Sequence, residues 1–180
     1  MQVRRVSNTL QYYGVHDLAG IPSVHAALPE TLVLCDSRMA LTSERNKFMS
    51  RLLPRNKLEE LSVQADAERL MLSDLAATRE KFSVTPQDVL NELSLLIAED
   101  YLLGTLTYEF CDSVMNGIIN AIVEVAMTNA MPQPAFSLYQ AFDAGEWIRS
   151  DDPPGTDPSE KYTRPAVQEI LRTYRESLLR

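Results

Sequence analysis

The stretch Thr85–Leu102, TPQDVLNELSLLIAEDYL, carries the strongest helix signal in the chain. It opens with a hydroxyl residue, a proline and Asp88 at the third helical position, an order of side chains that favours a helix start. Apolar residues then recur at the spacing of one helical face: Val89, Leu90, Leu93, Leu96, Ile97 and Tyr101. Because Leu95 and Leu102 fall on the other side, we expect burial on more than one flank, with Gly104 ending the helix.

The neighbouring segments continue the helical pattern in both directions. Thr107 is placed to cap a helix running to about Ala130, whose apolar residues cover roughly half of its circumference, so we expect it to be the central helix. Residues 55–81 predict one long helix, with a bend or a partly exposed seam where Glu68 interrupts the apolar face. Shorter helices are predicted over residues 42–53, 136–145 and 165–179.

Together these segments predict a mainly α protein, an irregular helical bundle of about five to six helices. Residues 1–40 lack a helical period, and their β-branched, apolar run Thr31–Cys35 predicts at most a short β pairing. The expected organisation is therefore an irregular N-terminal segment, residues 1–40, packed on a helical domain, residues 41–180. Within that domain an acidic loop, residues 146–162, precedes the final helix.

The charge of the chain is unevenly distributed. The 180 residues carry 25 acidic and 17 basic side chains, a net charge of −8, and residues 82–160 contain Arg149 as their single cation. Such a stretch repels a phosphate backbone, so nucleic acid is an unlikely partner, whereas a basic protein would be attracted to it. A local exception is a set of six basic residues that could belong to a helix-turn-helix: Arg38, Arg45, Lys47, Arg51, Arg55 and Lys57.

Two sets of side chains are candidates for partner binding. The first is a polar stripe on the predicted helix 107–130, which includes Glu109, Asp112, Asn116 and Asn120, together with Ser113 and Glu124. The second lies in the acidic loop and combines carboxylates with aromatic residues: Glu146, Trp147, Asp151, Asp152, Asp157 and Tyr162. Aromatic side chains supply buried area and charges set orientation and association rate, so this combination suits the surface of an Arg- or Lys-rich protein.

Reactive residues are few. His16 and Asp17 are adjacent, but neither His16 nor His25 has the further ligands that a metal site needs. Cys111 lies within an apolar face, where a buried, inert thiol is expected, and Cys35 ends the β-branched run. The sequence therefore predicts no catalytic residue, no metal and no cofactor. It also shows no secretory signal and no membrane span, so a soluble, cytoplasmic protein is expected.

These observations favour a small acidic protein that binds and neutralises or escorts a basic protein, as an immunity protein, an antitoxin or a chaperone does. One alternative is a helical enzyme that uses the carboxylate stripe, with or without a metal. Another is a structural or regulatory helical subunit that forms a homodimer through the face of residues 58–76.

Overall fold

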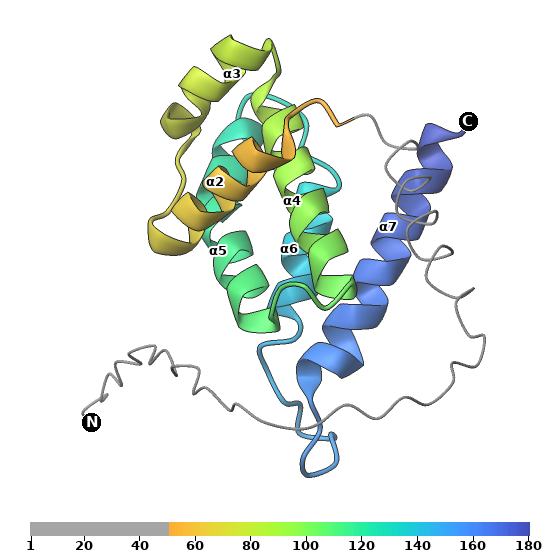
Figure 1. The fold of residues 1–180 in the computed structure, drawn as a ribbon. Helices are drawn as coiled ribbons and strands as arrows, with labels where there is room; N and C mark the ends of the chain where they lie inside the picture. Colours follow the sequence, from red (N-terminus) through yellow and green to blue (C-terminus); the bar gives the residue numbers. More distant parts are fainter. Residues whose placement is uncertain (1–50) are drawn as a thin grey trace, which may run out of the picture. The chain divides into compact units, whose positions relative to one another are not determined.

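The computed structural model describes residues 51–180, which form a bundle of α-helices (Figure 1). The predicted segment 1–40, the run Thr31–Cys35, the domain boundary at residue 41 and all but the end of the predicted helix 42–53 lie outside the described residues. The elements are α2 (Arg55–Ala67), η1 (Leu72–Leu75), α3 (Ala76–Phe82), α4 (Pro86–Leu102), α5 (Tyr108–Ala126), α6 (Ala135–Asp143), η2 (Ser159–Thr163) and α7 (Arg164–Leu178). No strand occurs in this part of the chain, so the mainly α prediction is confirmed.

Helix α4 begins and ends where the sequence predicts. The Thr85 hydroxyl accepts a hydrogen bond from the Asp88 N–H, and the Asp88 carboxylate accepts one from the Thr85 N–H, which completes a reciprocal cap. At the other end Gly104 takes a φ of 71°, a conformation that costs glycine little. Helix α4 packs against α2, α3, α5, α6 and α7, and α5, which the sequence suggested as the central helix, packs extensively on α2, α4 and α6, so the two helices share the centre of the bundle (Figure 1).

The prediction of one long helix over residues 55–81 is wrong. Helix α2 ends at Ala67, Glu68 is extended, and a turn leads into η1 and α3. The break is stabilised by α5: the Leu70 N–H donates to the Gly117 carbonyl (2.9 Å), and the Leu72 N–H donates to the Glu124 carboxylate (3.2 Å). Where Glu68 interrupts the apolar pattern of the sequence, the helix therefore ends and the chain takes a new direction.

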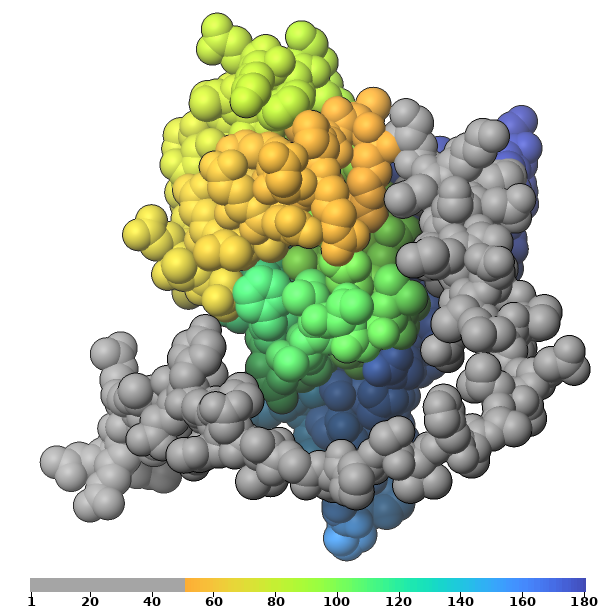
Figure 2. Space-filling model, viewed as in Figure 1, coloured from red at the N-terminus to blue at the C-terminus, as the bar shows by residue number. Residues whose placement is uncertain are grey.

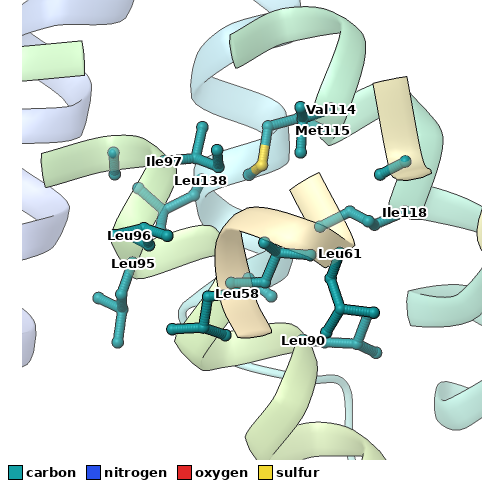
Figure 3. Packing of buried hydrophobic residues seen from close by; sticks show 14 of the residues in the cluster. Leu58, Leu61, Leu90, Leu95, Leu96, Ile97, Val114, Met115, Ile118 and Leu138 are labelled. Carbon is teal, nitrogen blue, oxygen red and sulfur yellow. The ribbon is translucent and has the colours of Figure 1, made fainter. Parts of the chain in front are cut away.

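The core is built mainly from leucine and isoleucine side chains of α2, α4, α5 and α6, which interdigitate between the helices (Figure 3). Leu58 and Leu61 of α2 point into the same cluster as Leu96 of α4 and Ile118 of α5. The apolar residues Leu58, Leu61 and Ala65 of α2 are therefore buried inside the bundle and do not form an exposed seam.

Helices α6 and α7 are joined by the predicted acidic loop. The prolines at positions 132 and 134 separate α5 from α6, as predicted, and α7 packs on α6 and α4 through its buried Val167 and Leu171. The loop protrudes at the lower end of the bundle in the views of Figures 1 and 2. It is therefore available to carry a site away from the core.

Candidate functional site

The polar stripe of α5 is divided among different roles. Glu109 is exposed, while Asp112, Asn116 and Asn120 are partly buried. Glu124 accepts the Leu72 N–H and so fixes η1 on α5. Asp112 and Asn116 lie instead near Glu146, in the turn after α6.

Asp112 and Glu146 come together at Asn116. The Asn116 side-chain amide donates to Asp112 Oδ2 and to Glu146 Oε1, each at 3.1 Å. Asp112 Oδ1 is inaccessible to solvent and has no hydrogen-bond partner. Three predicted site residues thus form one hydrogen-bonded cluster, although Glu146 is 30 residues from Asn116 in the sequence.

Helix α6 carries a third carboxylate, Asp143, whose negative charge acts on Asp112. Burial, the negative charges of Glu146 and Asp143, and a carboxyl–carboxyl contact with Glu146 raise the pKa of Asp112 to about 6. The pKa of Tyr139 is also raised, first by burial and then by the charges of Asp143, Glu146 and Asp112. We call the side chains of Asp112, Asp143 and Glu146 the acidic corner. No Lys or Arg among residues 51–180 forms an ion pair with any of the three.

Two large apolar side chains follow the acidic corner directly. Trp147 is 69% exposed and Ile148 is 63% exposed. The turn before them is held in place because the Tyr108 hydroxyl donates to the Phe142 carbonyl (2.8 Å). A Cβ at Gly145 would meet Thr163 Oγ1 at 2.1 Å, so the chain passes close to the end of η2 at this point. The site therefore joins unpaired negative charge to exposed apolar surface on a fixed turn.

The rest of the acidic loop is folded on itself, and three of its predicted partner-binding residues make hydrogen bonds within it. The Asp152 carboxylate has a fully covered side chain, pairs with Lys161 and accepts hydrogen bonds from the Tyr162 hydroxyl and the Arg149 N–H. The hydrogen bonds from Lys161 and Tyr162 lower the pKa of Asp152 to about 2. The Tyr162 ring also lies 3.5 Å beneath the Arg149 guanidinium. Asp152 and Tyr162 thus make their polar contacts within the loop.

Asp157 likewise has an internal role. Its carboxylate accepts hydrogen bonds from the backbone N–H groups of Ser159 and Glu160 and from the Ser159 hydroxyl, and these bonds lower its pKa. It therefore acts as a cap for η2. Asp151 is exposed, and its side chain makes no hydrogen bond within the described part of the chain.

Other carboxylates of residues 82–160 are neutralised by cations from outside that stretch. Glu99 pairs with Arg51 (2.6 Å) and Arg175 (3.2 Å), Asp100 with Arg55 (2.6 Å), and Glu160 with Arg164 (2.7 Å). The negative charge of residues 82–160 is therefore partly neutralised within the fold. The unpaired charge is concentrated at fewer places, of which the acidic corner joins three carboxylates.

The structure describes some of the other reactive and basic residues considered in the sequence analysis. Cys111 is fully buried, and burial raises the pKa of its thiol to about 12, as expected of an inert core cysteine. Lys57, like Arg51 and Arg55, is engaged in an ion pair with a carboxylate, so three of the six basic residues considered for nucleic acid are occupied. His16, His25, Cys35, Arg38, Arg45 and Lys47 lie outside the described residues. Over residues 51–180 no group of three His, Cys, Asp or Glu side chains is arranged to hold a metal ion.

Two grooves lie elsewhere on the bundle. One, of about 430 Å³, runs between α6 and α7 and is lined in part by Pro134, Ile170 and Tyr174. The other, of about 300 Å³, lies between α2 and the connection from α4 to α5, beside Val63 and Phe110. None of the site residues predicted from the sequence lines either groove.

The partner-binding residues predicted from the sequence do not include Tyr139 or Ile148, and they leave out Asp143 although it is one of the carboxylates beside the acidic loop. Asp143 and Tyr139 are four residues apart on α6, a spacing that places them on one helical face, and this signal could have joined them to Glu146. Ile148 follows Trp147 directly, so an apolar pair between charged residues was visible in the sequence.

Comparisons with known proteins add no relative: no protein-family model, curated protein or solved structure matches this chain. None of the helices over residues 51–180 combines the length and apolar character required to span a bilayer.

Proposed function

We propose that this protein binds a basic protein partner through the acidic corner and the adjoining Trp147 and Ile148. One observation supports this function. Three carboxylates that form no ion pair with a Lys or Arg of residues 51–180 lie next to two apolar side chains that are more than half exposed. Desolvated aromatic anchors provide most of the binding free energy at protein interfaces, while surrounding charges select the partner.

The physical role of each group follows from its position. Trp147 and Ile148 would be buried by the partner, and its Arg or Lys side chains would replace the missing counter-charges of Asp112, Asp143 and Glu146. A role in neutralising or escorting that basic protein, as an immunity protein, antitoxin or chaperone would have, is part of the proposal.

Affinity capture from the cells that produce the protein tests the proposal if two charge-matched variants are compared. The first combines Asp143→Lys with Glu146→Lys in the acidic corner. The second combines Asp66→Lys with Glu80→Lys, two exposed positions on α2 and the α3 helix. Both variants change the net charge equally, so only the position differs.

We expect wild-type protein and the Asp66/Glu80 variant to retain the same basic protein, and the Asp143/Glu146 variant to lose it. Trp147→Ala should weaken retention without changing the charge. Equal retention by both charge-reversed variants, or retention of proteins that are not basic, would contradict the proposal.

A further inference from the structure

One face of α5 leads from the acidic corner to an apolar end. Its residues recur every three or four positions and so lie on one side of the helix: Asp112, Asn116, Ile119, Val123 and Met127. At the far end Val123 is 40% exposed and Met127 is 76% exposed. With a rise of about 1.5 Å per residue, Met127 lies about 22 Å along the helix from Asp112. This face therefore has a negative end and an apolar end.

Helix α6 adds two aromatic side chains beside this face. It runs back along α5, because the chain turns after α5 ends and Glu146, beyond α6, returns to the Asn116 amide. Phe136 and Tyr139 share the face of α6 that carries Asp143. Both are half-buried, and their rings stack with centroids 6.3 Å apart. We call these side chains of α5 and α6 the apolar strip: Ile119, Val123, Met127, Phe136 and Tyr139.

The apolar strip has the composition of the core of a protein interface. The solvent face of a helix normally carries charged and polar residues, but residues 82–148 contain no Lys or Arg. Interface cores are depleted of charged residues and enriched in aromatic residues and methionine, and a polar rim surrounds them. The strip supplies such a core, and the acidic corner forms a charged edge at one end of it.

We propose that the apolar strip binds an amphipathic segment of the basic partner, whose Lys or Arg side chains lie at the acidic corner. The apolar side chains of this segment, about 22 Å further along, cover Val123 and Met127. The charges fix the direction of the segment, since the reverse direction would bury its cations on apolar surface without counter-charges. This inference rests on the proposed function, to which it adds the class of segment and its direction.

Oxidation of Met127 by hydrogen peroxide tests whether the strip is covered in the complex. An exposed thioether takes one oxygen atom from peroxide, which leaves water, and a covering partner slows this reaction. We expect Met127 of the full-length protein to be oxidised roughly fivefold more slowly when the captured basic protein is present at saturation. The buried Met115 should stay unoxidised in both samples, and N-acetylmethionine in the same solution standardises the peroxide dose.

Met127→Gln and Leu103→Gln form a matched pair of variants. Both residues follow the last residue of a helix with right-handed helical backbone angles, and both are mostly exposed, but Leu103 lies outside the strip. We expect Met127→Gln to raise the dissociation constant of the partner about tenfold, because an amide replaces a thioether in an apolar contact. Leu103→Gln should leave it unchanged, and circular dichroism verifies that both variants keep their helices.

Equal oxidation of Met127 in the free protein and in the complex would overturn the inference, as would equal effects of the two substitutions. Slow oxidation already in the free protein, with a dimer in light scattering that Met127→Gln dissociates, would assign the strip to a second copy and overturn it too. If the Asp143/Glu146 variant loses the partner while Met127→Gln binds it normally, the proposed function stands and the inference alone fails. If no basic protein is captured, the proposed function fails and this inference fails with it.

Discussion

At the scale of single residues, Asp112 and Asp152 have opposite environments despite their common prediction as partner-binding residues. Asp112 is partly buried beside Glu146 and Asp143, so its pKa is raised to about 6. Asp152 is covered by Lys161 and Tyr162, which lower its pKa to about 2. The sequence could not distinguish them, because the difference depends on which side chains the fold brings close, and Glu146 reaches α5 from the far end of α6.

Asp112→Asn is expected to stabilise the protein at neutral pH. The folded protein holds a proton on Asp112 more tightly than the unfolded chain does, so the ionised group lowers stability as pH rises through ~4 to ~6. Because Asp112 is only partly buried, solvent screening limits the expected gain to about 1 kcal/mol at pH 7.5, with little gain at pH 4. Urea denaturation at both pH values, with Asp151→Asn as control, measures it. A variant less stable than wild type at pH 7.5 would refute this interpretation.

Asp152→Asn is expected to loosen the loop while leaving the bundle intact. Substitution removes the ion pair with Lys161 and weakens the acceptor for Tyr162 and the Arg149 N–H. Limited trypsin digestion should therefore cleave after Arg149 or Lys161 several-fold faster than in wild-type protein, with an unchanged circular dichroism spectrum. Asp151→Asn is the matched control, since its carboxylate is exposed. Equal cleavage rates for the two variants would show that Asp152 does not hold the loop.

At the scale of elements, helix boundaries set by neighbouring residues could be predicted, whereas those set by contacts with distant parts of the chain could not. The start of α4 could be predicted because Thr85 and Asp88 cap each other within one turn of helix. The break after α2 could not, since its cause is the approach of α5. A side chain at Gly117 would meet the Ala65 carbonyl oxygen at 2.1 Å, and the Gly117 carbonyl accepts the Leu70 N–H. In the sequence, Gly117 is only one residue in an apolar helical run.

Gly117→Ala is therefore expected to destabilise the protein by about 2–3 kcal/mol, because the contact is with backbone atoms that cannot move independently. In an ordinary helix interior the same substitution would stabilise by up to ~1 kcal/mol, so the sign alone is informative. Chemical denaturation followed by circular dichroism measures the change. An unchanged or increased free energy of unfolding would show that α2 and α5 are not in close backbone contact.

At the scale of the whole molecule, the fold class could be predicted and the charge distribution could not. The helical periodicity sufficed for the mainly α bundle. The ion pairs of Glu99 and Asp100 join residues that are 45 to 76 positions apart, so counting the charges of each sequence segment could not reveal them. Of the residues predicted to bind a partner, Asp112, Asn116 and Glu146 are joined by hydrogen bonds and Trp147 follows Glu146, whereas Asp152, Asp157 and Tyr162 make hydrogen bonds within the loop. Their role in binding a partner stays a prediction.

The association rate of the captured basic partner as a function of salt tests the central claim most directly. Steering by unpaired carboxylates is screened by salt, since the Debye length falls from roughly 14 Å at 50 mM to roughly 4 Å at 500 mM. For wild-type protein and the Asp66/Glu80 variant we predict at least a tenfold decrease in the rate constant over this range. For the Asp143/Glu146 variant we predict a lower rate at 50 mM and a much flatter dependence. Identical salt dependence for all three proteins would contradict the account.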